Sequence, residues 1–292
     1  MSPTKVRRAD LAGSWYPARG SDCRKAIEGF MDPSLSCPGA RGEAVGGIVP
    51  HAGWVFSGKI ACNVIKCLDA QDGPDTCILF GRHLHKGSAN FIMTEGRWDT
   101  PLGELAIDSD LAAELAGEFE FTIETTSRYD GDNTIEVQLP FLKYFYPDIK
   151  IVPMGLPPHS GSLEIAKKAI EISRRMGRKA VVLGSTDLTH YGDNYGFMPR
   201  GVGEEAVRWV TQFNDKQAID RMMKMDEHAV LDASFKERNI CCPGAVATAI
   251  VAARELGAVQ AEQMIYGTSY DVRPDSSFVG YVGIVFIAKY AG

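Results

Sequence analysis

Three apolar runs, each followed by a turn that contains a histidine, constrain the fold of this 292-residue chain more than any other feature. The runs occupy residues 46–49, 76–80 and 180–184. Short apolar runs that end at a turn predict buried strands. Helical patterns, among them 57–68 and 162–176, lie between these runs. This alternation predicts an α/β fold with a mostly parallel central sheet and helices on both of its faces.

The polar residues just after the three runs form a candidate metal site. His51 follows the first run, His83 and His85 follow the second, and Asp187 and His190 follow the third. Because ligands gather at the carboxyl ends of parallel strands, we expect His51, one of His83 and His85, Asp187 and His190 to converge. Asp187 lies three residues before His190, so its carboxylate is expected to orient the imidazole. The alternative is a helix cap beside a surface histidine.

The cysteines point to one further candidate ligand. Cys241 and Cys242 directly precede Pro243, which suits the first turn of the helix expected from residue 245 to 253. A helix N-terminus favours the thiolate form of a cysteine, and the thiolate is the form that binds metal. Two histidines and a thiolate leave coordination positions open, as a catalytic metal site requires. The other cysteines have no CxxC spacing and are interpreted as small hydrophobic residues without disulfides: Cys23, Cys37, Cys62, Cys67 and Cys77.

The composition excludes several classes of partner. The chain has 31 Lys and Arg residues against 37 Asp and Glu residues and no basic run, which argues against nucleic acid. The apolar stretch at 245–253 is too short to cross a bilayer, and the first residues lack the apolar region of a signal peptide. We therefore expect a soluble, cytoplasmic protein with no membrane partner. No repeat or change of composition marks a boundary, so we expect a single domain over residues 1–292.

Six short motifs occur in order between about residue 10 and residue 285. They are Ala-Gly-Ser-Trp-Tyr-Pro at 12–17, Pro-His-Ala-Gly at 50–53, Ile-Glu-Val-Gln-Leu-Pro-Phe at 135–141, Thr-Asp-Leu-Thr-His at 186–190, Tyr-Gly-Thr-Ser at 266–269 and Ser-Ser-Phe-Val-Gly-Tyr at 276–281. With these motifs the chain resembles the MEMO family. That family is similar in fold to the class III extradiol dioxygenases, in which two histidines and a carboxylate hold a non-haem Fe(II) that binds catechol and O₂.

The resemblance implies a role for each candidate residue. MEMO proteins carry a cysteine where the dioxygenases carry the metal-binding carboxylate. The implied metal ligands are therefore His51, His83 and Cys241, and the implied metal is iron, with copper as the alternative. His190, together with Asp187, is implied as the acid/base pair.

Two ligand positions depart from the family pattern. The second run is followed by Gly-Arg-His in place of the usual Gly-Pro-Ser/Asn-His. If the family motif is aligned from Leu79, its histidine falls on His83. If it is aligned from Gly81, the histidine position falls on Leu84, next to His85, so His85 stays an alternative. Relatives carry a glycine after the metal-binding cysteine, whereas Cys242 follows Cys241 here. The register of the motif favours Cys241, and Cys242 is the alternative ligand.

Three further residues surround the expected pocket and are predicted to bind substrate. They are Arg82, His85 and Asn133, the last of which stands where relatives carry a histidine. The planar guanidinium of Arg82 suits a carboxylate, which predicts an anionic substrate such as a carboxylated phenol. The alternative is that Arg82 pairs with an acidic side chain of the protein.

The function expected from these residues is that of a metal-dependent oxygenase or related oxidoreductase. Its substrate would be small and aromatic or phenolic. One alternative is a metal-binding protein that has kept the fold without turnover and binds a protein partner at the pocket face. The other is a metal-dependent hydrolase, which the same open coordination permits.

Overall fold

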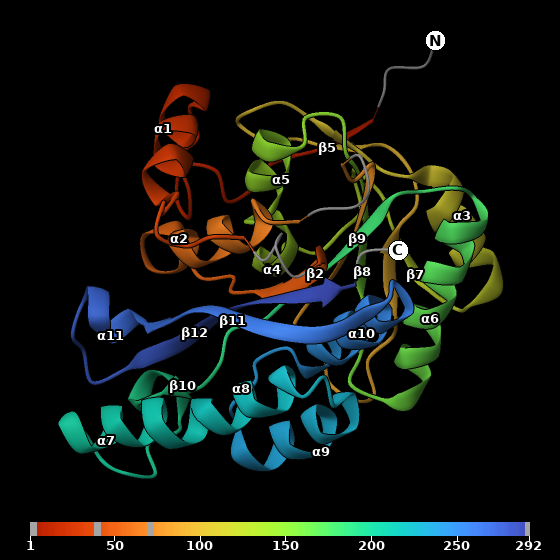
Figure 1. Cartoon of the computed structure of the whole chain (residues 1–292). Helices are drawn as coiled ribbons and strands as arrows, with labels where there is room; N and C mark the ends of the chain where they lie inside the picture. Colours follow the sequence, from red (N-terminus) through yellow and green to blue (C-terminus); the bar gives the residue numbers. More distant parts are fainter. Residues whose placement is uncertain (1–4, 38–41, 69–72, 290–292) are drawn as a thin grey trace.

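A computed structural model describes residues 5–37, 42–68 and 73–289 and contains a nine-stranded sheet flanked by helices (Figure 1). Its strands are β2 (Glu43–Val49), β3 (Thr76–Gly81), β4 (Phe91–Met93), β7 (Thr122–Glu124), β8 (Lys150–Gly155), β9 (Ala180–Ser185), β10 (His190–Tyr191), β11 (Ala258–Thr268) and β12 (Phe278–Ala288). A second sheet of three short strands joins β1 (Val6–Arg7), β5 (Arg97–Trp98) and β6 (Leu105–Ala106).

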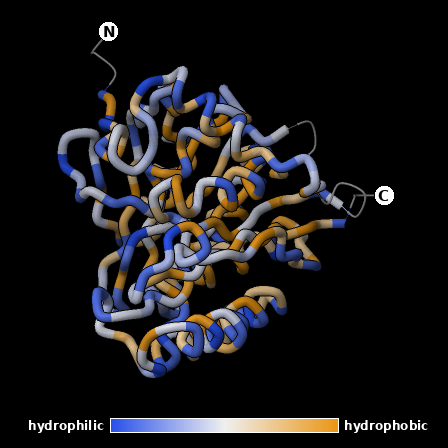
Figure 2. The backbone as a smooth tube through the Cα atoms, turned by 90° about the vertical axis from the view of Figure 1, so that its left-hand side faces the viewer, coloured by the Kyte–Doolittle hydropathy of each residue, from blue (hydrophilic) through white to orange (hydrophobic). Residues whose placement is uncertain are grey.

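The three apolar runs form the centre of the large sheet, as predicted. β2 pairs with β9, and β9 with β3, and both pairs are parallel. β3 also pairs in parallel with β8. Every residue of β3 and β9 is buried, which explains why these strands read as continuous apolar runs. Figure 2 shows that hydrophobic stretches of the chain gather inside the molecule.

The prediction of a mostly parallel sheet holds for the centre and for the pair β4–β7, but an antiparallel pair borders the centre on each side. β12 pairs antiparallel with β2, β10 and β11, and β4 pairs antiparallel with β8. β11 and β12 are joined by a connection that holds only the short helix α11, and a connection this short favours an antiparallel pair. The sheet is therefore mixed.

Helices cover both faces of the sheet. They are α1 (Gly20–Phe30), α2 (Trp54–Ile65), α3 (Ser109–Glu118), α4 (Asn133–Glu136), α5 (Leu139–Phe145), α6 (Ser160–Arg175), α7 (Glu204–Trp209), α8 (Asp215–Met223), α9 (Glu227–Glu237), α10 (Pro243–Glu255) and α11 (Ser269–Val272), with the short turn η1 (Asp193–Tyr195) and the π-helix η2 (Val210–Asn214). None of the helices in the described ranges is both long and apolar enough to cross a membrane.

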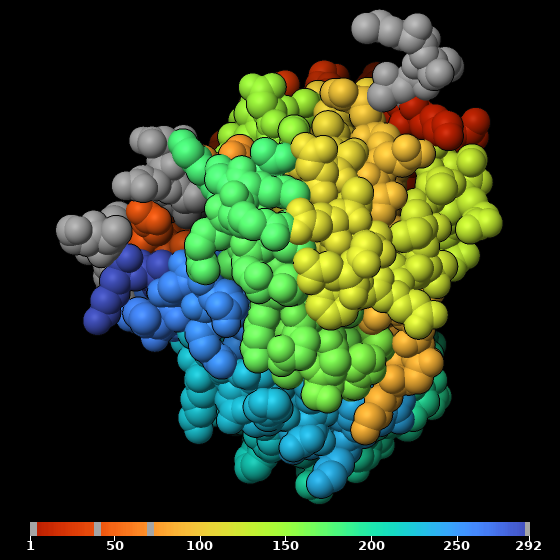
Figure 3. All heavy atoms as spheres, turned by 90° about the vertical axis from the view of Figure 1, so that its right-hand side faces the viewer, coloured from red at the N-terminus to blue at the C-terminus, as the bar shows by residue number. Residues whose placement is uncertain are grey.

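Two glycines of the sheet show which helix covers which face. A Cβ on Gly47 of β2 would lie 2.7 Å from Val64 of α2. A Cβ on Gly184 of β9 would lie 2.7 Å from Ala249 of α10 and 2.8 Å from Ile48, which follows Gly47. Because successive strand residues point to opposite faces, α2 and α10 lie on opposite faces of the sheet. α6 lies between α10 and α3 and contacts both helices (Figure 3).

The helical segment from 203 to 237 departs from its expected pattern at one position. The spacing of the apolar residues in this segment predicts a buried helical stripe that includes Phe213, but the Phe213 side chain is 63% exposed. Phe213 lies in the π-helix η2, whose wider turn shifts the following residues relative to a 3.6-residue period. The stripe predicted from a regular helix is therefore wrong at this position.

The prediction that the chain has no disulfide is also wrong. Cys37 and Cys67 form a disulfide, with their Cα atoms 5.2 Å apart. The segment after α1 folds back onto the end of α2, where the Lys66 ammonium donates to the carbonyls of Asp32 and Leu35. This approach is a tertiary contact, and the spacing of the cysteines in the sequence does not reveal it.

Candidate metal centre

The carboxyl ends of β2, β3 and β9 meet at one edge of the sheet. Val49 of β2 pairs with Ser185 of β9, and Phe80 of β3 pairs with Gly184. The backbone N–H of Thr186 donates to the carbonyl of Val49 at 2.9 Å, which continues the pairing beyond β9. The turns that follow the three strands are therefore held side by side.

His51 is buried and presents one ring nitrogen to the site. Its Nδ1 lies 3.1 Å from Ser185 Oγ, and that hydroxyl donates to the carbonyl of Thr134 at 2.6 Å. Ser185 Oγ therefore accepts from Nδ1, and the lone pair of the neutral ring is left on Nε2. Nε2 has no hydrogen-bond partner within the described part of the chain. A buried, unpaired imidazole nitrogen whose other nitrogen is held by a hydrogen bond fits a metal ligand.

His83 lies next to His51 but is half exposed. The two rings meet edge to face, with their centroids 5.0 Å apart. The Nδ1 of His83 lies 3.8 Å from a carboxylate oxygen of Asp132, which leaves Nε2 for another partner. Asp132 raises the pKa of His83 to about 10, and Cys241 adds to the effect although burial opposes it. Asp132 is itself fixed, because it accepts from the N–H of Thr134 at the start of α4.

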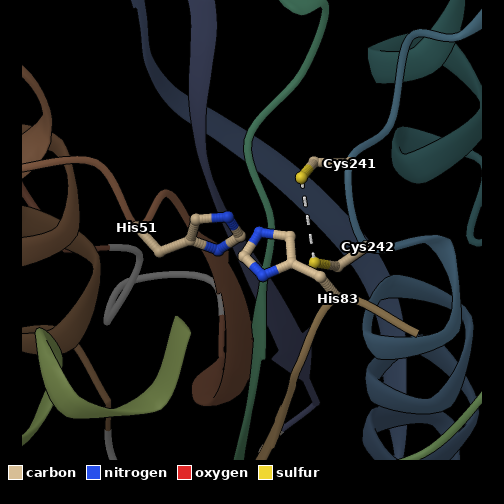
Figure 4. A group of neighbouring side chains, drawn as sticks. All are labelled: His51, His83, Cys241 and Cys242. Carbon is tan, nitrogen blue, oxygen red and sulfur yellow. Dashed lines mark hydrogen bonds between the residues drawn. The ribbon is translucent and has the colours of Figure 1, made fainter. Parts of the chain in front are cut away.

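The two cysteines reach the same place from the start of α10 (Figure 4). The N–H of Cys241 donates to the carbonyl of Asp187 at 3.0 Å, and the N–H of Cys242 donates to Thr186 Oγ1 at 3.0 Å. The turn after β9 therefore holds both cysteine backbones. A hydrogen bond from the Cys242 thiol lowers the pKa of Cys241 well below its usual range. Burial opposes this shift, whereas His51 and His83 add to it.

The donor set of this group fits a metal ion. Ligand atoms of His51, His83, Cys241 and Cys242 all lie within 4.8 Å of one another. Imidazole and thiolate ligands together suit zinc, copper and iron, whereas magnesium and calcium prefer oxygen. His85, the alternative second histidine, does not belong to this group: its side chain is exposed.

Asp187 contacts His51 rather than His190. One oxygen of Asp187 accepts from the N–H of His51 at 2.8 Å, and the other lies 3.7 Å from His51 Nε2. Burial weakens the protonated form of His51, but Asp187 and Cys241 outweigh it and raise the pKa of the imidazole. His190 has other contacts: its Nδ1 lies 3.2 Å from the carbonyl of Leu188, and its ring meets that of Tyr195 edge to face. The expected Asp187–His190 hydrogen bond is not among the described contacts.

A cavity of about 800 Å³ opens beside this group, and seven of its lining residues are tryptophan, tyrosine or phenylalanine. His51, His83, Asp187 and His190 form its polar end. The remaining wall includes Trp15, Tyr16, Phe30, Trp54, Phe56, Tyr195 and Tyr281. Sequence reasoning did not identify these residues as pocket residues. The available signal was the Trp-Tyr-Pro sequence at 15–17, which belongs to the first of the six motifs.

Comparisons with known proteins agree with the six motifs. The family model described as Memo-like protein matches residues 7–285. The chain belongs to the Memo family. The MEMO1 family protein TK1477 of Thermococcus kodakarensis is 34% identical over 96% of this chain and 99% of its own length. The MEMO1 family protein PF1638 of Pyrococcus furiosus is 33% identical, over 96% of this chain and 98% of its own length. A solved structure, uncharacterized protein JW3007 from Escherichia coli K12, has a TM-score of 0.48 and 12% identity over 73% of this chain and 86% of that chain, and we draw no argument from it.

In this Memo family chain, Arg82 does not line the aromatic cavity as expected. Its guanidinium donates to Glu124 at 2.6 Å and to Asp130 at 3.3 Å, and it lies over the ring of Phe91. The backbone of Arg82 is left-handed, with φ 70°, and its side chain packs against Gly155. These contacts support the alternative that Arg82 pairs with acidic side chains of the protein.

We therefore predict that Arg82 contributes to stability rather than to ligand binding. Arg82→Met should lower the free energy of unfolding by about 2 kcal/mol, because it removes one of the two guanidinium groups that pair with the nearly buried Glu124 carboxylate and leaves only Arg7. Arg97→Met, which breaks an exposed pair with Glu104, should cost less than about 1 kcal/mol. Urea unfolding compares the variants. A selective loss of binding of a carboxylated phenol relative to a neutral catechol in Arg82→Met would contradict this assignment.

The other two residues predicted to bind substrate lie at different places. Asn133 lines the aromatic cavity, and its side-chain amide donates to the carbonyl of His51 at 2.9 Å. His85 instead lines a smaller cavity of about 450 Å³, which shares His83 and His190 with the larger one. Of the three residues, only Asn133 therefore borders the aromatic space.

A buried carboxylate behind His190 explains two of the Memo motifs. Asp215 accepts from both the N–H and the hydroxyl of Thr189, the residue before His190. Its second oxygen accepts from the Tyr266 hydroxyl at 2.8 Å. A Cβ on Gly280 would collide with that same oxygen, so this position requires glycine. Tyr266 and Gly280 therefore act together to hold Asp215 against the turn that carries His190.

Asp215 gives a prediction about stability and pH. Burial raises its pKa from the ordinary 3.8 to about 6, although the hydroxyls of Thr189 and Tyr266 oppose the shift. Since the native state binds this proton more tightly than the unfolded state, the stabilisation is complete below pH 3.8 and is lost as the pH rises through about 6. As the pH rises through this range, the free energy of unfolding of the wild type should fall by about 3 kcal/mol relative to that of Asp215→Asn.

Urea unfolding of both proteins at about pH 4 and pH 7.5 measures this difference. Asp232→Asn, which changes an exposed carboxylate, is the control and should show no pH-dependent difference from the wild type. An equal gap between wild type and Asp215→Asn at both pH values would show that Asp215 does not titrate as expected.

Proposed function

We propose that this protein is a metal-dependent oxidoreductase of the oxygenase type that acts on a small aromatic or phenolic substrate. His51, His83 and Cys241 hold the metal, with Fe(II) as the first candidate and copper as the second. The observation that carries the proposal is the unpaired Nε2 of buried His51, which belongs to one group of ligand atoms with His83 and Cys241. The two histidines of this group also line the aromatic cavity, and Cys241 lines the smaller cavity beside it.

The cavity supports the choice of substrate. Its volume of about 800 Å³ lies in the range of small-molecule sites, and seven tryptophan, tyrosine and phenylalanine residues contribute to its wall. Aromatic rings pack well against such walls, edge to face or stacked. The polar groups lie together at one end, so a phenol would enter with its hydroxyl toward His51 and His83.

The chain's own groups supply proton transfer and orientation. The Nδ1 of His190 faces the carbonyl of Leu188, a pure acceptor, so its Nε2 carries the lone pair of the neutral ring. His190 lines the cavity and can accept the proton of a phenol there. Asn133, anchored on the carbonyl of His51, borders the same space. A bound metal ion would supply a Lewis acid that lowers the pKa of a coordinated hydroxyl, together with a redox centre.

Anaerobic loading followed by oxygen uptake tests this proposal. Purified protein is loaded with one equivalent of Fe(II), or of Cu(I) in parallel, and O₂ consumption is recorded with a panel of catechols and other phenols. We expect uptake that depends on the metal and on one class of phenol. Stable metal binding without substrate-dependent uptake would refute oxygenase activity and favour a non-catalytic metal-binding protein.

A further inference from the structure

Cys242 occupies a position in the metal centre that the three-ligand arrangement does not use. Cys242 is 2% exposed, and its sulfur lies beside that of Cys241 (Figure 4). The two sulfur atoms are 4.0 Å apart. Ligand atoms of Cys242 and both histidines fall within the same 4.8 Å group.

The spacing of the two sulfurs matches a four-coordinate site. In a tetrahedral zinc site with Zn–S distances of about 2.3 Å, two thiolate ligands lie about 3.8 Å apart. The observed separation of 4.0 Å needs almost no adjustment to reach this value. Two sulfurs that approached only for packing would have no reason to share one centre with two imidazole nitrogens.

The backbone of the cysteine pair is fixed in this position. Hydrogen bonds from the N–H groups of Cys241 and Cys242 hold the pair to the turn after β9, as described above. On the other side, a Cβ on Gly244 would collide with the carbonyl of Leu156, so α10 begins in close contact with the end of β8. Ligands held in place before binding lose little freedom on binding.

We propose that Cys242 is a fourth metal ligand and that the resting centre is a closed, tetrahedral His₂Cys₂ site for a thiophilic ion, Fe(II) or copper as well as Zn(II). The inference rests on the proposed function for the identity of the other three ligands. It adds a control on access, because a centre with four protein ligands has no open position. An external ligand or substrate reaches the ion only when Cys242 leaves its place.

Cobalt(II) is the probe for this inference, because its thiolate charge-transfer absorption grows with the number of bound sulfurs. The wild-type protein should give the absorption of two thiolates and should not change its visible spectrum on addition of azide. Cys242→Ser should lose about half of the charge-transfer intensity and should respond to azide, because one position is now open. Its affinity for Zn(II) should fall by more than the 10- to 100-fold typical of losing an outer partner.

Serine separates the two roles that Cys242 can have. It keeps a hydrogen-bond donor toward Cys241 but removes the soft sulfur ligand. Cys77→Ala is the matched control: it also removes a buried thiol, on β3, and should leave the cobalt spectrum unchanged. Thermal unfolding of each variant identifies loss of the fold.

Three results would overturn the inference. The first is a cobalt spectrum of Cys242→Ser equal to that of the wild type, which would show that Cys242 is a hydrogen-bond donor to Cys241 and not a metal ligand. The second is an azide response of the wild type itself. The third is failure of the wild type to retain Co(II) or Zn(II), which would remove the metal centre and the proposed function together. A two-thiolate cobalt spectrum without any oxygen uptake would instead support the closed site while refuting the oxygenase.

Discussion

Replacement of His51 by Ala, or of Cys241 by Ser, will weaken metal binding by at least about 100-fold. Each change removes one donor atom from the group, and no other histidine or cysteine of the described residues lies in that group to replace it besides His83 and Cys242, which are already part of it. His51 is buried with Nε2 unpaired, and alanine would leave an apolar hole there. Serine at 241 keeps the shape of the turn but exchanges a soft thiolate for a hydroxyl, a weak ligand for zinc, copper or iron.

Metal analysis after dialysis, together with competition against a chelator of known affinity, measures the effect. His228→Ala is the control for a lost histidine, since this side chain is 72% exposed and lies on α9. It should keep the wild-type metal content. If the His51 and Cys241 variants both retain one equivalent of iron, copper or zinc, the metal is bound elsewhere and the assignment of this site fails.

The central strands could be predicted from the sequence because burial on both faces leaves a direct trace. β3 and β9 have no exposed position, so their sequences are unbroken apolar runs. The antiparallel flanks leave no comparable trace. β12 is also buried along its whole length, and nothing in its own sequence states that its partners run in the opposite direction. Strand direction follows from connections and partners, which a periodicity argument does not include.

The site shows the same division. A histidine at the end of an apolar run can be read directly, which led to His51 and His83. The groups that orient these imidazoles, Ser185 and Asp132, are joined to them by contacts that no local pattern encodes. Asp187 illustrates the difficulty: its spacing suggested His190 as partner, but the sheet brings it to His51, which is 136 residues away.

Replacement of His190 by Ala will leave the metal in place and reduce oxygen uptake with a phenolic substrate by roughly 100-fold or more. His190 lies on β10, which pairs with the start of β12 and not with the strands that carry the metal group. It is absent from the group of converging ligand atoms, although it lines the cavity beside them. Loss of this imidazole should therefore affect proton transfer and not metal retention.

Two measurements on the same preparation test the role of His190. Metal content should equal that of the wild type, and kcat with the phenolic substrate should fall by roughly 100-fold or more. His228→Ala is a matched control, because this histidine is 72% exposed on α9 and its loss should leave kcat unchanged. If His190→Ala loses its metal as fully as His51→Ala does, His190 belongs to the ligand set. A His190→Ala enzyme with full activity would show that the proton leaves by another route, and the hydroxyl of Tyr195, whose ring packs against His190, would be the next residue to replace.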